Sequence, residues 1–357
     1  MTDQETYDHT LDPPAPASAL PNEPYYQRPE EPQRAPRPKR LGVALVLIGL
    51  LLLAFQLIGH GLSFGSSGSI TLVDQDYQGS RIELSAAASD VEIRPGGSRI
   101  HVEAIQRGGS RGDYQLDVVP SGDTLRVTET SRSFFCFFCS RRVHYTISVP
   151  AGAQADIHTG SGQIDVEGLS GAVSLASVSG DVHASDMTGG LTVSTTSGDV
   201  QLSDIAGKLD VGSISGDVTL ENGKIDGATI NTTSGEVALD GVAGPLKLTS
   251  VSGDISVRDA RDGALSFSTT SGEIEYDGSL ARGSANKVDS ISGDVRLRLP
   301  ESSGFRLDAS TVSGDLSSEF QLLGGESPLR GLRGVAGDGS ATLTIGTTSG
   351  DIRIERQ

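Results

Sequence analysis

Residues 196–220 read TSGDVQLSDIAGKLDVGSISGDVTL, and this stretch contains the pattern that decides the fold. Residues 197–199 are typical of a turn, because glycine permits positive φ and the Ser and Asp side chains can bond to their own backbone. Val200 and Leu202 then alternate with polar residues, which is the two-residue period of a strand with one buried face. Residues 208–211 repeat this alternation, so each unit reads as a turn followed by a short strand.

The same turn signal recurs along the second half of the chain. Its glycines are Gly162, Gly180, Gly198, Gly216, Gly235, Gly253, Gly272, Gly293, Gly314 and Gly350. A second glycine lies near each midpoint, at Gly171, Gly189, Gly207, Gly227, Gly244, Gly263, Gly283 and Gly304. The repeating unit is therefore about nine residues, and two units make a period of about 18. We interpret the final spacing of 36 residues as two periods from which one Ser-Gly element, around 324–334, has been lost.

Units this short cannot bury a core alone, but coils stacked in parallel can bond to one another about 4.8 Å apart. We therefore predict an all-β fold, a parallel β-solenoid or β-helix built from coils of about 18 residues. The residue before each Ser-Gly pair alternates between Val or Ile and Thr, which would stack like on like in a coil of about 36 residues. The larger coil is therefore an alternative. An antiparallel sandwich of hairpins is another, and the regular spacing disfavours it.

The N-terminal part has a different composition from the repeats. Residues 1–40 hold nine of the 15 prolines, and we predict a disordered tail. Residues 41–59 contain no charge and are long enough to span a bilayer. Four basic residues lie in 34–40 and the next is Arg81, so the positive-inside rule places the tail in the cytoplasm and the repeats outside. We expect a retained single-pass anchor in the cell membrane rather than a cleaved signal peptide, because no clear cleavage site follows.

The remaining chain divides by the regularity of its pattern. Residues 60–68 form a linker, and 69–158 contain strand signals with looser spacing. We predict that 69–158 cap the solenoid, because the ends of a stack must be covered. Residues 159–357 form the repeat array. The low aromatic content of 4% and the absence of tryptophan suit thin stacked layers better than one large globular core.

The acidic balance of the chain limits its partners. A formal net charge of −18 disfavours binding to nucleic acid phosphates. Stacked carboxylates could bind calcium, yet the GGxGxD pattern of calcium-binding β-rolls is missing, so we favour turn capping. The carboxylates after Ser-Gly form one predicted column of Asp181, Asp199, Asp217, Glu236, Asp254, Glu273, Asp294, Asp315 and Asp351.

The two cysteines, Cys136 and Cys139, lie in an unusual FFCFFC segment. Zinc would need two further ligands, and no partner motif supplies them. Outside the cytoplasm a local disulfide is the favoured prediction. The neighbouring aromatic side chains either pack under the cap, which we favour, or form an exposed contact tip. These side chains are Phe134, Phe135, Phe137 and Phe138.

Three segments precede the array, ASDVEI at 88–93, YTISVP at 145–150 and GSGQIDVEG at 160–168. In this order, followed by the Ser-Gly array, they resemble a bacterial family of β-strand-repeat, adhesin-like proteins with a domain of unknown function. The related head domains of autotransporter adhesins are similar. The resemblance covers residues 69–357, and the FFCFFC segment departs from it. It implies a β-solenoid at the cell envelope, sometimes near envelope-stress systems, and no catalytic residues.

The sequence offers no recognisable catalytic, cofactor-binding or metal-binding residue. The histidines at His101, His144, His158 and His183 are scattered, and neither HExxH nor GxSxG occurs. We therefore predict a binding or structural module of the envelope, not an enzyme, with an envelope protein or a glycan as partner. A carbohydrate-active β-helix enzyme is the alternative, and a non-repeating patch of Asp, Arg and Lys on one face would favour it.

Overall fold

The computed structural model describes residues 69–108, 114–131, 142–326 and 330–357. The chain divides into two compact units, Met1–Gly65 and Ser66–Gln357, and all of the described residues belong to the second. Across these described ranges the structure has 26 strands and no helix, and hence no helix that could cross a bilayer. The predicted tail, membrane span and linker lie outside the described residues.

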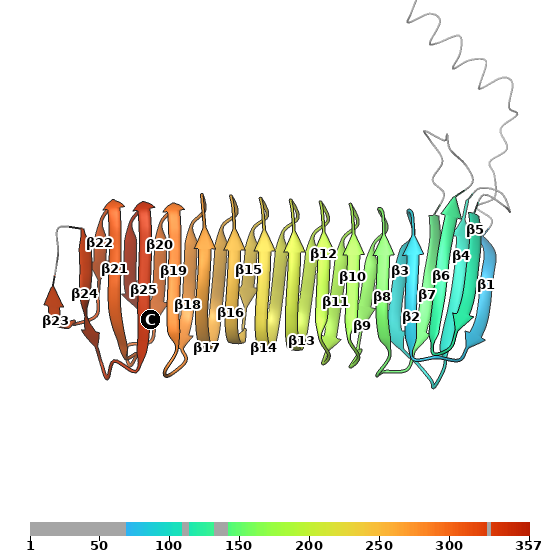
Figure 1. Cartoon of the computed structure of the whole chain (residues 1–357), viewed down its shortest axis with the longest axis horizontal. Coiled ribbons are helices and arrows are strands. Elements are labelled where there is room, and N and C mark those ends of the chain that lie inside the picture. The colour runs from blue at the N-terminus through green and yellow to red at the C-terminus, as the bar shows by residue number, and fades with distance from the viewer. Residues whose placement is uncertain (1–68, 109–113, 132–141, 327–329) are drawn as a thin grey trace, which may run out of the picture. The chain divides into compact units, whose positions relative to one another are not determined.

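The strands form two faces, A and B, that pack against each other (Figure 1). Face A consists, in spatial order, of β5 (Tyr114–Ser121), β6 (Thr124–Ser131), β2 (Arg81–Ala86), β8 (Gln154–Thr159), β10 (Val173–Ser177), β12 (Leu191–Thr195), the second parts of β13 (Val200–Ser213) and β14 (Val218–Thr232), β16 (Ala243–Ser250), the second part of β17 (Ile255–Thr269), β19 (Ala285–Ser292), β25 (Ala341–Ser349), β21 (Phe305–Ser313), β24 (Gly331–Ala336) and β23 (Leu323–Glu326).

Face B is built from the other strand of each coil. It consists of β1 (Ser69–Tyr77), β4 (Ile100–Arg107), β7 (Arg142–Val149), β3 (Asp90–Pro95), β9 (Ile164–Glu167), β11 (Val182–Met187), the first parts of β13 and β14, β15 (Val237–Asp240), the first part of β17, β18 (Ile274–Leu280), β20 (Val295–Leu299), β26 (Ile352–Arg356) and β22 (Leu316–Ser318).

The register of the parallel strands confirms the coil of about 18 residues. Val173 pairs with Leu191, which in turn pairs with Leu209, so each coil stacks directly on the next. Both the 36-residue coil and the antiparallel sandwich are therefore wrong for the array. Within the described ranges, antiparallel pairs occur only towards the two ends of the stack, where one set contains β1, β4, β5, β6 and β7 and the other contains β21, β23 and β24.

The core lies between the two faces and follows the period-2 pattern. Val200 and Leu202 point inward from face B, and Leu209 and Val211 from face A, each at most 2% exposed. Gln201 between them is exposed. Burying these aliphatic side chains supplies the main stabilisation, at about 25 cal/mol for each Å² of apolar surface removed from water. One inward column of face B contains Val182, Val200, Val218, Val237, Ile255, Ile274, Val295 and Ile352.

The alternation of Val or Ile with Thr lies on the outside of the turns, which explains why it does not set the coil length. Its apolar members are 47–57% exposed, so Ile can follow Thr from coil to coil without a packing conflict. The exposed apolar members are Val178, Ile214, Val251, Ile291 and Val312.

With the exception of Gly314, the Ser-Gly glycines are required for a reason other than the positive φ expected from sequence. Gly198 does not have a positive φ, so left-handed backbone does not explain it. A Cβ on Gly198 would instead lie 2.0 Å from the carbonyl oxygen of Gly180 in the coil below. The same close approach recurs at Gly216, whose Cβ would lie 1.9 Å from the Gly198 oxygen. These turns can stack one coil apart only because no side chain separates them.

The C-terminal coil is inserted into the stack. Strands β25 and β26 lie between the β19–β20 coil and the β21–β22 coil, so the chain ends inside the stack (Figure 1). A Cβ on Gly350 would meet the Gly293 oxygen, and one on Gly314 would meet the Gly350 oxygen. Our interpretation of a lost Ser-Gly element was therefore wrong. The spacing of 36 residues arises because the last coil turns back and fills the place beside Gly293.

The other end of the stack shows a matching inversion of order. Strand β2 lies between β6 and β8 on face A, although it precedes both in sequence. Strand β3 likewise lies between β7 and β9 on face B. Both ends of the array are thus completed by segments distant in sequence.

Candidate functional site

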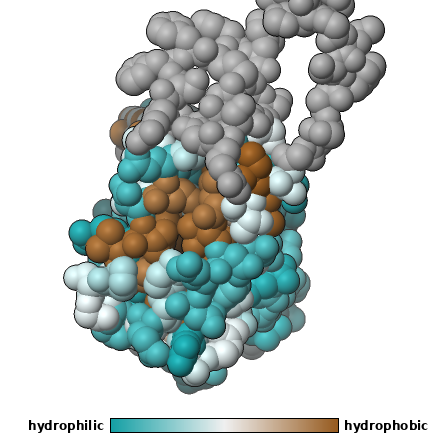
Figure 2. Space-filling view, turned by 90° about the vertical axis from the view of Figure 1, so that its right-hand side faces the viewer, coloured by the Kyte–Doolittle hydropathy of each residue, from teal (hydrophilic) through white to brown (hydrophobic). Residues whose placement is uncertain are grey.

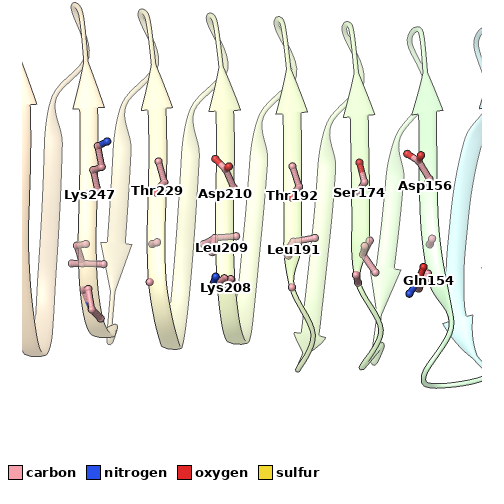
Figure 3. A pocket seen from close by; sticks show the side chains of 18 of the residues that line it. Gln154, Asp156, Ser174, Leu191, Thr192, Lys208, Leu209, Asp210, Thr229 and Lys247 are labelled. Atoms are coloured by element: carbon pink, nitrogen blue, oxygen red, sulfur yellow. The ribbon is translucent and has the colours of Figure 1, made fainter.

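A long groove of about 810 Å³ runs across the outer surface of face A. One wall carries outward side chains from successive strands, held in register one coil apart (Figure 3). That spacing is about 4.8 Å, so the six steps between seven strands give a groove of roughly 25–30 Å. The residues of this wall are Asp156, Ser174, Thr192, Asp210, Thr229, Lys247 and Ser266.

The groove is open because small residues occupy the row beside this wall. This row contains the small residues Ala172, Gly190 and Gly227 among larger neighbours such as Lys208 and Pro245. A Cβ added to Gly190 or to Gly227 would meet no atom within 4 Å. These glycines therefore leave free space above the sheet, in contrast to the glycines of the Ser-Gly turns.

The charges around the groove differ from those around a second hollow, which lies on face B. Arg81, Lys208 and Lys247 line it together with two carboxylates, Asp156 and Asp210. A hollow of about 690 Å³ on face B is lined instead by four carboxylates, one arginine and one histidine, namely Glu92, Asp165, Glu167, Glu221, Arg94 and His183. The groove on face A is thus the hollow better suited to a neutral or acidic ligand.

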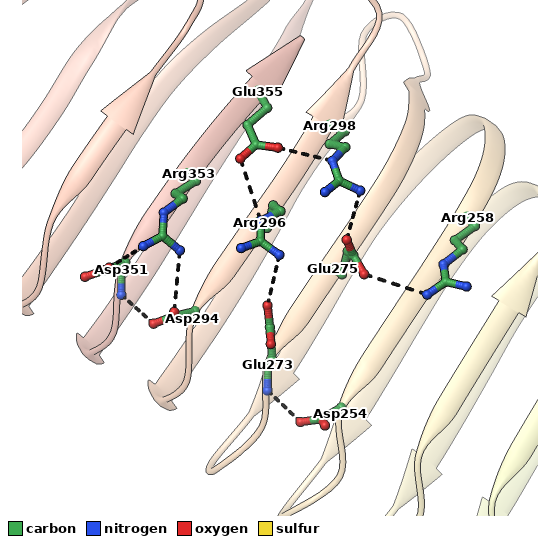
Figure 4. Close-up of polar contacts among 10 residues, drawn as sticks. All are labelled: Asp254, Arg258, Glu273, Glu275, Asp294, Arg296, Arg298, Asp351, Arg353 and Glu355. Atoms are coloured by element: carbon green, nitrogen blue, oxygen red, sulfur yellow. Dashed lines mark hydrogen bonds and ion pairs between the residues drawn. The ribbon is translucent and has the colours of Figure 1, made fainter. Parts of the chain in front are cut away.

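Face B carries a network of ion pairs across β17, β18, β20 and β26 (Figure 4). The Arg298 guanidinium lies 3.0 Å from Glu275 and 3.1 Å from Glu355. Arg296 continues the network, at 3.4 Å from Glu273 and 3.7 Å from Glu355. This is a non-repeating patch of the kind that would favour an enzyme, but each of its glutamates faces a guanidinium. The hydrogen bond to Glu355 and the charges of both glutamates raise the pKa of Arg298, so its guanidinium stays protonated.

Removing the central guanidinium tests what this network contributes. We expect Arg298→Ala to lower the free energy of unfolding by about 1 kcal/mol at low salt, because two glutamates lose a shared partner at a largely solvated site. The difference should shrink in high salt, which screens exposed charges. Thermal unfolding at two salt concentrations measures both effects. Arg99→Ala is the matched control, because Arg99 is exposed and makes no ion pair with any described residue. Equal losses for the two variants would contradict the network.

The predicted capping role is confirmed for six aspartates of the acidic column, namely Asp181, Asp199, Asp217, Asp254, Asp294 and Asp351. The Asp181 carboxylate accepts the backbone N–H of Asp199 at 3.0 Å, and Asp199 accepts that of Asp217 at 3.0 Å. Each aspartate therefore satisfies a backbone donor of the next coil. Asp351 accepts from Asp315 in the same way, which extends the column through the inserted C-terminal coil.

The four histidines in the described ranges lie apart from one another, each beside a carboxylate on the surface. His158 is 3.1 Å from Asp156, and His183 is 3.1 Å from Asp165. His101 lies 2.9 Å from Asp76, while His144 lies 3.7 Å from Glu92. In the part of the chain that the structure describes, no group of three or more His, Cys, Asp or Glu residues could hold a metal ion.

The FFCFFC segment lies outside the described residues. The disulfide between Cys136 and Cys139 therefore remains a prediction. So do the two alternatives for Phe134, Phe135, Phe137 and Phe138, packing and contact tip.

A buried acidic residue near the N-terminal end of the stack was missed by the sequence analysis. Glu129 is 7% exposed and accepts hydrogen bonds from Ser89 at 2.5 Å and from Tyr145 at 3.0 Å. Burial, and then the Glu129 charge, raise the pKa of the Tyr145 phenol, so it remains a donor. The alternating pattern of β6 did place Glu129 inward, but no sequence feature showed which hydroxyl groups would meet it.

Comparison with known proteins decides the family. A family model described as Toastrack DUF4097 matches residues 79–285 and 281–355. The chain belongs to the Toastrack DUF4097 family. This confirms the resemblance drawn from the Ser-Gly array to an adhesin-like domain of unknown function. None of the curated proteins matches this chain.

Several crystal structures are similar to this Toastrack chain. A candidate adhesin from Bacteroides fragilis is 12% identical, with a TM-score of 0.35 and coverage of 81% of this chain and 98% of that one. A candidate lipid-binding protein from Parabacteroides distasonis is also 12% identical, with a TM-score of 0.33 and coverage of 81% and 97%. A candidate cell adhesion protein from Clostridium sporogenes is 10% identical, with a TM-score of 0.20 and coverage of 81% and 100%.

The groove and the ion-pair network of the Toastrack domain both consist of outward strand positions. Neither was predicted, because the turn residues and the inward strand positions determine the fold and say nothing about how outward side chains group. The signal was present: Glu275 and Asp277 recur one coil later as Arg296 and Arg298, which pairs opposite charges across strands. The small residues at 172, 190 and 227 were likewise visible as breaks in an outward row.

Proposed function

We propose that this Toastrack protein is a single-pass membrane protein whose solenoid is displayed outside the cytoplasm and holds an extended glycan in the face A groove. The groove itself carries the proposal. Its length, its repeat of about 4.8 Å and its hydroxyl, carboxylate and ammonium groups suit a linear chain rich in hydroxyls better than a compact metabolite. The groove is lined by three cationic side chains and two carboxylates, and this balance favours a neutral or acidic glycan.

The role proposed is binding without catalysis. A glycosidase needs two carboxyl groups placed on either side of a bond, one of them held as an acid. In the groove, Asp156 and Asp210 lie three coils apart on one wall, with Ser174 and Thr192 between them (Figure 3). At about 4.8 Å a coil, that separation of roughly 14 Å exceeds the range for a glycosidase pair.

Two glycines allow a matched test of the groove. Ser66–Gln357 is a compact unit with its own core, so it can serve as a soluble fragment on a glycan array. We expect Gly227→Tyr to weaken binding roughly tenfold or more, because the ring fills free space in the groove. Gly212→Tyr is the control, since Gly212 lies on the same face outside the groove and its Cβ would also meet nothing within 4 Å. Equal binding by both variants would place the ligand elsewhere.

The topology has a separate test. Protease added to spheroplasts should digest the repeats and spare the tail, because only the repeats are outside the membrane. If the repeats are protected from the protease, the proposal that the solenoid lies outside the cytoplasm is wrong, whatever the glycan array shows.

A further inference from the structure

One end of the stack leaves apolar side chains accessible. It is formed by β1 on face B and β5 on face A, and each of these strands pairs with only one other strand among those described. Figure 2 shows apolar surface at this end, bordered by polar residues. We call the half-buried residues here the apolar end. They are Leu72, Val73, Tyr77, Tyr114, Leu116 and Val118.

The charge of the chain changes along the stack. Residues 69–149, which include the apolar end, carry nine basic and ten acidic side chains. Residues 150–357 carry 14 basic and 29 acidic side chains. An anionic membrane surface would therefore repel the array strongly and the apolar end hardly at all.

The sequence also limits how far the apolar end can lie from a membrane. The predicted span ends at residue 59, and β1 begins at Ser69. The nine residues between them reach at most about 30 Å when fully extended. A short tether of this kind keeps the local concentration of lipid near β1 high, so even a weak apolar contact becomes populated.

We propose that the apolar end rests on the outer surface of the lipid bilayer, with the acidic array directed away from it. This rests on the anchor in the proposed function. The partner is the headgroup and upper acyl region of the bilayer, where apolar side chains insert and where Tyr is favoured because its ring is apolar and its hydroxyl polar. Tyr77 and Tyr114 provide such rings at this end.

The absence of tryptophan makes the test direct. Leu116→Trp places a unique fluorophore at the apolar end. Leu323→Trp places one on β23 at the opposite end, where Leu323 is 67% exposed. The full chain is reconstituted in phosphatidylcholine vesicles containing phosphatidylglycerol, with or without bromine on the acyl chains. We expect brominated lipid to remove roughly half of the emission of Leu116→Trp, since residues seated in the interface reach the upper acyl region. The emission of Leu323→Trp should not change.

Other outcomes overturn the proposal in distinguishable ways. If the chain floats with the vesicles but Leu116→Trp is not quenched, the apolar end does not rest on the bilayer, while the proposed membrane anchor still holds. Failure to float would overturn the anchor as well. Blue-shifted emission that grows with protein concentration, without quenching, would show that a second copy covers the end. If Leu116→Trp does not fold by circular dichroism, Leu72→Trp on β1 replaces it. Glycan binding by the groove is independent of all these outcomes.

Discussion

The variant Leu202→Asp is expected to unfold at a temperature roughly 10 °C below that of the unaltered fragment 66–357, because it places a carboxylate between the two faces. Leu202 is 2% exposed and lies among the aliphatic columns of the core. An unpaired charge in such a place costs several kcal/mol even after relaxation and water entry. For a domain of this size each kcal/mol lowers Tm by about 2–4 °C.

The neighbouring residue provides the control for this variant. Gln201 is exposed on face B, so Gln201→Asp should change the free energy of unfolding by about 0.5 kcal/mol or less. Thermal unfolding followed by circular dichroism compares the two. A Tm for Gln201→Asp as low as that for Leu202→Asp would mean that the assignment of inward and outward positions is wrong.

The second large effect is expected from adding a single methyl group. In Gly216→Ala the new Cβ would lie 1.9 Å from the Gly198 carbonyl oxygen, and neither backbone can move without lengthening the hydrogen bonds between coils. We expect a loss of about 3 kcal/mol or more, at the upper end of the cost of inserting atoms into a packed site. Denaturant unfolding of the soluble fragment measures this loss.

Gly212→Ala separates this steric effect from a general effect of replacing glycine. Gly212 has open space around its Cβ position and no positive φ, and it lies only four residues away. There alanine should be neutral or stabilise the fold by up to about 1 kcal/mol, since it restricts the unfolded chain. Similar losses at both positions would refute the close approach of the turns.

The repeat itself was predictable because each of its signals is local. Alternation identified Val200, Leu202, Leu209 and Val211 as core residues, and all four are buried. The spacing of the Ser-Gly pairs identified the 18-residue coil, and the short carboxylates after them identified the caps. None of these inferences required knowledge of which strands pair over long distances.

The order of the coils at the two ends was not predictable in the same way. A spacing of 36 residues fits a lost element and an inserted coil equally well, because sequence spacing does not show which strand lies beside which. The groove also escaped prediction, since it depends on several outward rows lying side by side. Its residues, such as Ser174 and Thr192, look like ordinary polar surface until the register is known.

The inserted coil makes closure of the stack depend on residues 341–356. Because these residues lie between two other coils, the stack cannot close until they have been synthesised. Early termination or proteolytic clipping near the C-terminus would therefore open a gap in the interior. The strands β19 and β20 would then present unpaired edges, which promote aggregation and degradation. Chains that lack residues 341–356 should therefore aggregate or be degraded more readily than chains that retain them.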